Sequence, residues 1–339
     1  MQPRAETPPM PPFEPWRHRY ALLVAFATVI LLLAGGLVTS TGSGLAVPDW
    51  PLSFGRFFPR MTGGVLFEHG HRLVAASVGL LTLVLALWFR ACERRPWVRR
   101  LAYAAVGAVI AQGLLGGLTV LLRLPPAVSV LHACLAQGFF CIVVVLAMAT
   151  SQSFQFGPSG TAGTDVSPAL WKVGALATGL VYLQLILGAV MRHTGAGLAI
   201  PDVPLAFGRL VPPFDSFEIG IHFAHRVGAL LVAVAVLVLA GWILRRHAGL
   251  AGLAVPAKLL VLMVMAQMAL GAATVLSRLA VLPATAHVVL GALLLATCLV
   301  VTVRAARARV VRLPDARSRP VLHPGGAAAV PQSTAGSAA

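Results

Sequence analysis

The chain has 339 residues, of which 58% are hydrophobic and only 11% are charged. Soluble domains carry about 25% charged residues, so this composition excludes an ordinary soluble protein. The formal net charge of +16 could indicate a nucleic-acid partner, but the positions of the basic residues along the chain indicate a membrane protein instead.

The sequence begins with a proline-rich segment, residues 1–18, which we expect to be a disordered cytoplasmic tail. Apolar stretches of about 20 residues, the length that crosses a bilayer, then recur along the chain. We predict eight membrane-spanning helices, at 19–39, 66–89, 101–122, 127–150, 171–191, 218–244, 257–276 and 282–303. Residues 304–339 are predicted to form a second cytoplasmic tail.

Basic residues concentrate in alternate connections between these helices. Of the 26 Lys and Arg residues, 18 fall on the side that carries both termini. The positive-inside rule therefore predicts that both termini are cytoplasmic. We expect a multi-pass protein of a bacterial-type plasma membrane, in contact with anionic lipid and not with nucleic acid.

Two long segments of the sequence occur twice. Residues 35–56, GGLVTSTGSGLAVPDWPLSFGR, align without a gap with residues 188–209, and 13 of the 22 positions are identical. Residues 112–132 align with 267–287, with nine identities in 21 positions. The chain is therefore a tandem duplication, with an N-terminal repeat at 19–150, a cytoplasmic linker at 151–170 and a C-terminal repeat at 171–303.

Each repeat contains four spans, an even number, so both repeats enter the membrane in the same orientation. We predict an all-α membrane protein made of two tandem four-helix bundles, related by a pseudo-twofold axis along the membrane normal. Four-helix bundles hold cofactors between facing helices.

Histidines occupy equivalent places in the two repeats. His71 and His225 lie in the second helix of each repeat, and His132 and His287 lie in the fourth. A histidine in a membrane span is costly unless it is paired or ligated. Isolated examples are most often satisfied by hydrogen bonds, but four at one depth near the outer face favour haem ligation by two imidazoles per iron. A zinc site would need further ligands nearby, and no CxxCH sequence is present for covalent haem attachment.

One acidic residue distinguishes the two repeats. Glu68 lies three residues before His71, on the same side of a helix. When His71 is aligned with His225, Glu68 corresponds to His222, with a one-residue gap in the preceding loop. Glu68 could stabilise the start of the helix or pair with Arg72, or it could act as a carboxylate beside a haem pocket. The asymmetry suggests that one repeat performs chemistry and the other holds a permanent electron-transfer cofactor.

Other polar groups in the spans are less informative. His222, on the same face as His225, could orient that ligand or simply lie at the interface. His69 points away from His71, so a direct role is not favoured, and we expect His193 to be solvated in an outer loop. No disulfide is predicted, because none of the cysteines lies in an outer loop. The cysteines are Cys92, Cys134, Cys141 and Cys298.

Several motifs together resemble the haem A synthase family. They are TGSGLAVPDWPLSFG, E-x-x-H-R at Glu68–Arg72, H-R at His225–Arg226, and the histidines of the fourth and eighth spans. The resemblance covers residues 19–303 and implies an oxidoreductase that oxidises the C8 methyl group of haem O to a formyl group by successive hydroxylations. Some bacterial members carry a cysteine pair in the outer loops, which this chain lacks.

The resemblance also implies roles for particular residues. His225 and His287 would ligate a haem b cofactor, while His71 and His132 would hold the iron of the substrate haem. Glu68 would take part directly in oxidation of the methyl group. Arginines near the outer face are candidates for contacts with the haem propionates. These arginines are Arg56, Arg72, Arg209 and Arg226.

Haem O and haem A would then be substrate and product, and a haem O synthase and oxidase-assembly factors would be plausible partners. One alternative is a dihaem b-type cytochrome that only transfers electrons, which predicts two near-equivalent halves. Another is a transporter with Glu and His as a proton relay. A transporter would place ionisable groups near the bilayer midplane, whereas here they cluster at the outer end.

Overall fold

The computed structural model describes residues 13–156 and 166–310, which form eight long helices and no strand. The long helices are α1 (Pro15–Ser40), α2 (Gly64–Cys92), α3 (Pro96–Leu121), α4 (Pro126–Thr150), α6 (Leu170–His193), α7 (Phe217–Arg246), α8 (Ala251–Leu276) and α9 (Val281–Val310). Two short elements, α5 (Gln152–Phe156) and the 3-10 helix η1 (Ala196–Leu198), lie in the connections. All eight long helices are long and apolar enough to cross a bilayer. The chain is a multi-pass membrane protein.

The eight predicted spans are confirmed, but four of their boundaries differ from the prediction by four residues or more. Helix α3 begins at Pro96, five residues before the predicted start. Helix α1 begins at Pro15 and α9 continues to Val310, so parts of both predicted tails are helical. Residues 1–12, 157–165 and 311–339, which hold the rest of the predicted tails and much of the linker, lie outside the described residues.

Helix α8 begins at Ala251, six residues before the predicted start, and therefore contains Pro256. A proline has no N–H to donate to the carbonyl four residues earlier, which here belongs to Gly252. Arg304 of α9 donates to that carbonyl at 2.6 Å. This bond from a neighbouring helix satisfies the freed carbonyl and lets α8 extend past the proline.

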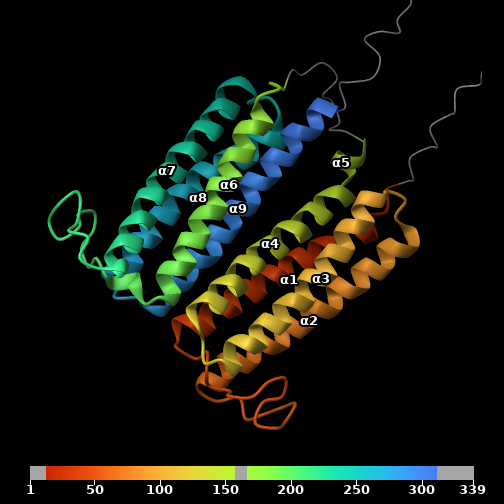
Figure 1. Cartoon of the computed structure of the whole chain (residues 1–339). Helices are drawn as coiled ribbons and strands as arrows, with labels where there is room; N and C mark the ends of the chain where they lie inside the picture. The colour runs from red at the N-terminus through yellow and green to blue at the C-terminus, as the bar shows by residue number, and fades with distance from the viewer. Residues whose placement is uncertain (1–12, 157–165, 311–339) are drawn as a thin grey trace, which may run out of the picture.

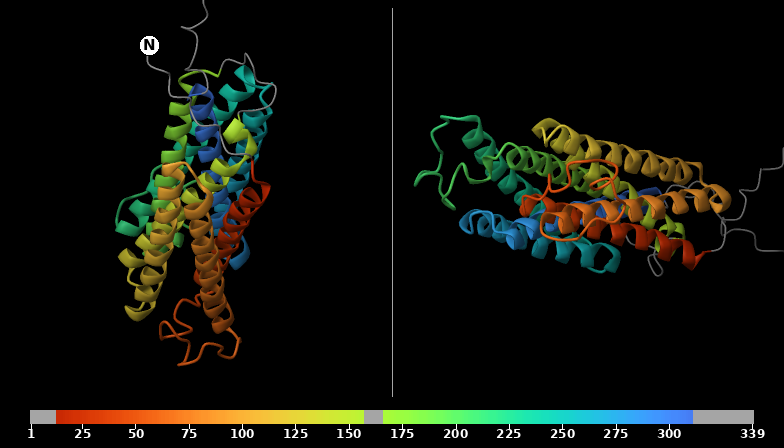
Figure 2. Two further views of the ribbon diagram at one scale, coloured as in Figure 1. Left: turned by 90° about the vertical axis from the view of Figure 1, so that its right-hand side faces the viewer. Right: turned by 90° about the horizontal axis from the view of Figure 1, so that it is seen from below.

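The long helices pack in two groups of four (Figure 1). We call α1–α4 the N-terminal half and α6–α9 the C-terminal half. Each half has its own apolar core, which includes Phe89 and Leu146 in the first and Leu239 and Leu260 in the second. Helices α1 and α4 pack against α6 and α9 where the halves meet. The views in Figure 2 show the same grouping from two further directions. The pseudo-twofold relation of the halves stays a prediction.

The two ends of the helix assembly differ. Both long connections, residues 41–63 between α1 and α2 and residues 194–216 between α6 and α7, lie at one end, which we call the loop end (Figure 1). The start of α1 and the end of α9 lie at the other end, which we call the terminal end. The positive-inside rule predicts that the loop end faces outward.

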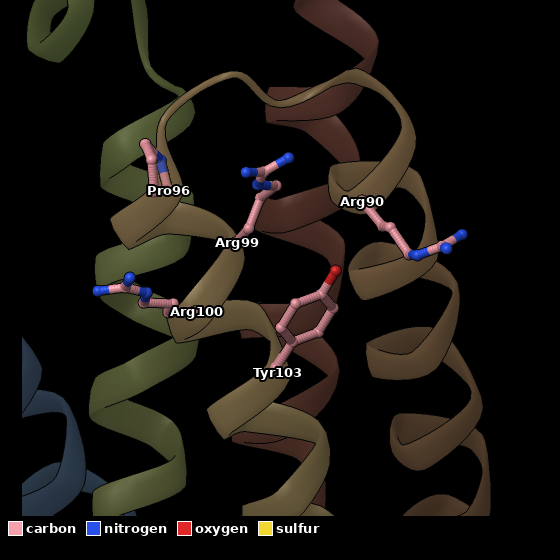
Figure 3. A pocket seen from close by; sticks show the side chains of 5 residues that line it. All are labelled: Arg90, Pro96, Arg99, Arg100 and Tyr103. Atoms are coloured by element: carbon pink, nitrogen blue, oxygen red, sulfur yellow. The ribbon is translucent and has the colours of Figure 1, made fainter.

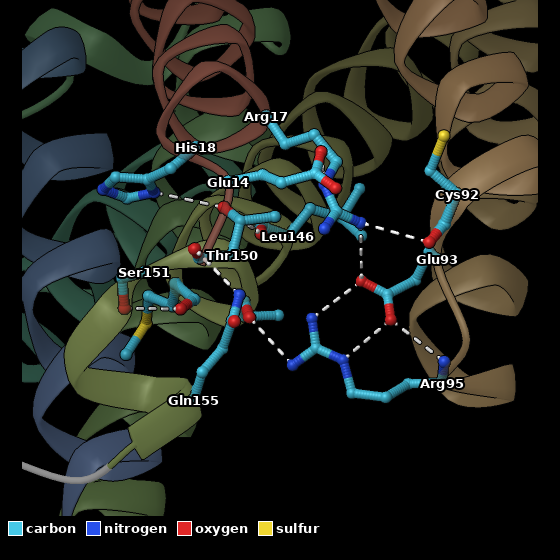
Figure 4. Close-up of polar contacts among 12 residues, drawn as sticks. Glu14, Arg17, His18, Cys92, Glu93, Arg95, Leu146, Thr150, Ser151 and Gln155 are labelled. Carbon is cyan, nitrogen blue, oxygen red and sulfur yellow. Dashed lines mark hydrogen bonds and ion pairs between the residues drawn. The ribbon is translucent and has the colours of Figure 1, made fainter. Parts of the chain in front are cut away.

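A buried polar network closes the terminal end of the N-terminal half (Figure 4). Glu93, just after α2, is buried and pairs with Arg95 at 2.8 Å and with Arg17 of α1 at 3.9 Å. Arg17 also pairs with Glu14 at 2.8 Å, and Arg95 donates to the carbonyl of Ala149 in α4 at 2.9 Å. These bonds satisfy the buried charges and fix α1, α2 and α4 relative to one another.

A shallow depression of about 540 Å³ lies beside this network, between α2 and α3 (Figure 3). Arg90, Arg99 and Arg100 line it with Pro96 and Tyr103. It is a basic surface at the terminal end, whereas the four repeat-matched histidines lie toward the opposite end of the helices.

One large side chain of the first loop fits against a glycine of α3. The indole of Trp50 covers the buried Gly117, and a Cβ on that glycine would lie only 2.5 Å from Trp50 Cδ2. At the aligned positions of the C-terminal half stand Val203 and Ala272. The smaller loop residue thus accompanies the larger helix residue, as we expect if the two positions also meet in the C-terminal half.

We predict that Gly117→Ala destabilises the protein by about 1–3 kcal/mol, because the added methyl group overlaps the Trp50 indole. Gly113→Ala is the matched control, since no atom lies within 4 Å of a Cβ at that position of the same helix. Thermal unfolding of the purified protein measures the difference. Combining Gly117→Ala with Trp50→Val, the pair found in the other half, should restore stability. Equal midpoints for the two alanine variants would contradict the predicted contact.

Candidate functional site

The four histidines of the duplication lie on four helices at similar depth. His71 on α2, His132 on α4, His225 on α7 and His287 on α9 each fall in the first three turns from the loop end. All four side chains are half-buried. Each half therefore contributes two imidazoles near the same end of the molecule.

Each of these imidazoles packs against a glycine of the preceding helix in the sequence. A Cβ on the glycine would come within about 3 Å of the ring atom Cε1, so any larger residue would displace the ring. The pairs are Gly35 with His71 (3.1 Å), Gly116 with His132 (3.2 Å), Gly188 with His225 (3.0 Å) and Gly271 with His287 (3.1 Å).

The histidine pair of the C-terminal half has the spacing of two ligands on one metal. The ring centres of His225 and His287 are 6.4 Å apart, and the ring planes are inclined by 68°. Two imidazoles that bind one metal from opposite sides, by bonds of about 2.0 Å, have ring centres roughly 6 Å apart. The distance between the two ring centres is therefore in the range of two ligands on one metal, and ligation of an iron stays a prediction.

Glutamines on the neighbouring helices support this pair. Gln184 Nε2 of α6 lies 3.0 Å from Nδ1 of His225 and donates to the backbone carbonyl of the same histidine at 2.7 Å. Gln267 of α8 donates to the carbonyl of His287 at 3.0 Å. Polar groups that hold the second ring nitrogen orient a ligating histidine. The residue aligned with Gln184 in the N-terminal half is Leu31.

The N-terminal pair is less constrained by side chains. Nδ1 is buried without a hydrogen-bond partner in both His71 and His132, as far as the described residues extend. Nδ1 of His287, in the C-terminal pair, is also buried without a hydrogen-bond partner among the described residues. Buried imidazole nitrogens without partners are typical of positions that bind a ligand or metal. Within residues 13–156 and 166–310 no group of three or more His, Cys, Asp or Glu residues could hold a bare metal ion, so the sites offer pairs of imidazoles only.

Glu68 joins α2 to the first long loop. Its side chain is buried, with Oε2 accepting from the Val47 N–H at 2.7 Å and Oε1 paired with Arg72 at 2.6 Å. Arg72 in turn donates to the carbonyls of Asp49 at 2.7 Å and Leu52 at 3.0 Å. The ion pair that the sequence suggested is present. Both carboxylate oxygens are engaged, and a role of Glu68 in proton transfer stays a prediction.

His222 takes the place of Glu68 in the C-terminal half. Its buried Nδ1 lies 3.3 Å from the backbone N of Ile200, the residue that aligns with Val47. Arg226 donates to two carbonyls of the second loop at 2.8 and 2.9 Å. His222 therefore contacts the loop backbone rather than His225, and both helix-borne arginines bind loop carbonyls instead of pointing free toward a ligand.

The two long loops contain the same turn. In the first, Asp49 accepts from the Phe54 N–H at 2.8 Å and the Gly55 N–H at 2.9 Å, while Ser53 and Arg56 exchange backbone hydrogen bonds, each of 3.0 Å. Phe54 and Gly55 both have positive φ, 53° and 68°, as a type I′ turn requires. The amides of Gly55 and Phe54 hold the pKa of Asp49 below its usual value.

The second loop repeats these contacts. Asp202 accepts from Phe207 at 2.8 Å and Gly208 at 2.9 Å, and φ is 56° and 72° at the two residues. The same two amide bonds, that of Gly208 first, lower the pKa of Asp202. Because the contacts agree atom for atom, the sequence duplication is also a duplication of structure in the loops.

The remaining candidates divide between structural and exposed positions. His69 is buried and bonds the hydroxyl of Ser53 at 2.8 Å. The side chains of Arg56 and Arg209 are exposed in the loops, and their contact with propionates stays a prediction. His193 was predicted to be solvated in a loop, but it is the last residue of α6 and half-buried, because α6 extends two residues beyond the predicted span. All four cysteines are free thiols.

Three features of the site were missed from the sequence. The glycines that face the histidines lie within the repeated segments, so their identity at matched positions was the available signal. Gln184 gives only a weak signal, as a polar residue in an apolar helix. Arg192, which donates to Ser40 of α1 at 2.9 Å, could have been noticed as a basic residue on the predicted outer side.

Fold and site define a class: an eight-helix membrane protein with one histidine pair in each half, held at the loop end by glycine contacts. Comparison with known proteins narrows this class. Residues 62–299 match the COX15-CtaA family, described as cytochrome oxidase assembly proteins.

Proteins named heme A synthase are similar to most of the chain. That of Shouchella clausii is 33% identical over 263 residues, covering 76% of this chain and 86% of the relative. The protein of Symbiobacterium thermophilum is 36% identical over 233 residues, which cover 65% of this chain and 73% of the relative. The protein of Halalkalibacterium halodurans is 30% identical over 288 residues, which cover 84% of this chain and 95% of the relative. The chain belongs to the haem A synthase family.

The depressed pKa values of Asp49 and Asp202 predict an acid-sensitive loop structure. A carboxylate with a lowered folded-state pKa contributes stability above its unfolded pKa and loses it as pH falls through the folded value. We expect the protection factors of the Phe54 and Gly55 amides, the ratio of the intrinsic to the observed exchange rate, to fall at acid pH. Asp49→Asn should exchange faster already at neutral pH, in the first loop only, with Phe207 and Gly208 as internal control. Unchanged protection in Asp49→Asn would contradict the anchoring role.

Proposed function

We propose that this protein is a haem A synthase, an enzyme of haem biosynthesis that oxidises the C8 methyl group of haem O to a formyl group by successive hydroxylations. Family membership supports the substrate and product. The observation that carries the proposal is the presence of two equivalent histidine pairs whose surroundings differ. One pair lies beside a carboxylate, and the other is braced by an additional glutamine.

The C-terminal pair is proposed to hold a resident haem b. His225 and His287 have the ring spacing for axial ligation, and Gln184 fixes the orientation of His225. Such bracing favours a permanently bound group, because the ligand geometry is set before binding. When bound, haem b supplies an iron that accepts and returns single electrons, which suits a relay for electrons removed from the substrate.

The N-terminal pair is proposed to bind the iron of haem O. Leu31 stands at the position aligned with Gln184, and Nδ1 of His71 has no hydrogen-bond partner among the described residues. A weaker constraint on the ligands is consistent with a site that must release its product. The apolar helix surfaces around the pair suit the porphyrin ring, while the loop end supplies polar groups for the propionates.

Glu68 is the proposed catalytic group, because it lies one helical turn from His71 and has no acidic counterpart in the other half. In this role the carboxylate would accept a proton or stabilise positive charge near the substrate. Its bonds to Val47 and Arg72 give it a fixed position. The aligned His222 also bonds the backbone of its loop, so that contact by itself does not require a carboxylate.

Topology completes the proposal. Both termini are placed in the cytoplasm of a bacterial-type cell and the histidine pairs near the outer face of the plasma membrane, as the distribution of basic residues indicates. Haem O synthase and oxidase-assembly factors are the proposed partners, since they would supply the substrate and use the product.

The activity test is expression in membranes that contain haem O but no haem A, followed by extraction and chromatography of the non-covalent haems. We expect haem A to appear with the unaltered chain. Glu68→His should abolish it while retaining the fold, because His222 occupies this position in the other half. Arg60→Gln, at an exposed site in the same loop, is the control. Full activity of Glu68→His would assign Glu68 a structural role, and haem B alone at two per chain would favour the electron-transfer cytochrome.

Resident haem should depend on the C-terminal pair and its glycine. We expect His225→Ala and His287→Ala to purify with little haem b, and Gly188→Ala to lose at least half, because its methyl would lie 3.0 Å from His225 Cε1. Gly179→Ala, in the same helix with no atom within 4 Å, should keep full haem content. Absorbance spectra and a haem-to-protein ratio provide the readout. A normal bis-histidine spectrum in both histidine variants would place the cofactor in the other half.

A further inference from the structure

A cluster of hydrogen-bond donors lies where the two halves meet at the loop end. Arg192, near the end of α6, donates through Nη2 to the hydroxyl of Ser40, the last residue of α1, at 2.9 Å. Thr285 of α9 donates to the same Ser40 oxygen, also at 2.9 Å. Thr285 is buried and the other two side chains are half-buried. The three residues come from three helices and from both halves.

The donors of this cluster outnumber its acceptors. Ser40 Oγ accepts two hydrogen bonds, which leaves its own O–H free to donate. Arg192 has five N–H groups, and only the bond to Ser40 is formed within the described residues. No carboxylate of residues 13–156 or 166–310 pairs with it. A partly buried cation without a counter-ion is costly. We therefore expect an anion to bind beside Arg192.

The position of Arg192 relates it to the C-terminal histidine pair. Residues four apart lie on the same face of a helix, so Arg192 lies one turn beyond Gly188, the residue that contacts the His225 ring. Thr285 lies in the same turn of α9 as His287. A planar macrocycle ligated by the two histidines would carry its acidic substituents toward the polar loop end, one turn from its iron, where Arg192 lies.

The N-terminal half has no equivalent cation. Thr39 aligns with Arg192, and Val130 aligns with Thr285. Two of the four arginines that the sequence offered as carboxylate contacts, Arg72 and Arg226, bind loop carbonyls instead. The donor cluster is therefore specific to the C-terminal site.

We propose that Arg192, Ser40 and Thr285 form a carboxylate-binding site at the interface of the two halves, and that its ligand is a propionate of the haem held by His225 and His287. This inference rests on the proposed function, because it requires haem in the C-terminal half. The bidentate geometry of a guanidinium suits a carboxylate. Binding it would join both halves through one ligand.

The test compares haem b with its dimethyl ester, in which both propionates are uncharged. Full-length protein carrying His71→Ala and His132→Ala, which leaves only the C-terminal pair, is depleted of haem and titrated with each compound by absorbance. We expect the ester to bind roughly 10- to 100-fold more weakly, the effect of losing a charge-assisted hydrogen bond. Adding Arg192→Gln should reduce this discrimination to less than about threefold, and Arg192→Lys should retain part of it.

Arg278→Gln is the matched control, because Arg278 is an exposed arginine at the loop end of the same half; it should keep the full discrimination. A normal bis-histidine spectrum of Arg192→Gln with the ester verifies folding and ligation. Undiminished discrimination in Arg192→Gln would overturn the carboxylate site while leaving haem ligation intact. Failure of the C-terminal pair to bind either compound would instead overturn the haem assignment. The affinity difference between haem b and its ester could instead depend on Arg192 only when His225 and His287 are both replaced by alanine. That result would assign the carboxylate to the haem held by the N-terminal pair.

Discussion

At four helix pairs an imidazole packs closely against a glycine of the neighbouring helix, and this contact sets the arrangement of both halves. In a bilayer, helices associate through packing of small residues more than through exclusion of water. Each glycine lets a neighbouring helix approach until the ring is held in place. The position and depth of both histidine pairs, and the distance between facing helices, follow from these four contacts.

The loops extend this order beyond the helices. Buried Glu68 and Arg72 bind the backbone of the first loop, and His222 and Arg226 contact that of the second. Backbone groups that cannot reach water need such partners. The loop end is therefore a fixed structure next to each histidine pair, and Glu68 helps to position the first loop.

The two halves share one framework but differ at the residues that would set chemistry. Leu31 corresponds to Gln184, Thr39 to Arg192, and Glu68 to His222. Each difference adds a polar brace or a cation to the C-terminal half, or a carboxylate to the N-terminal half. Such differences suit a division between a permanently held cofactor and an exchangeable substrate, whereas two equivalent electron-transfer sites would need none of them.

Reading the sequence was enough to predict the eight spans, the duplication and the four histidines. Span length, self-similarity and the cost of a polar group in hydrocarbon can all be judged from the order of residues along the chain. It could not show that Arg304 would satisfy Gly252 and extend α8 past Pro256, or that Arg192 and Thr285 would meet at Ser40. Helices that are apolar on nearly every side give little periodicity from which to read their rotation. Which side chains face each other across helices was decided only by packing in three dimensions.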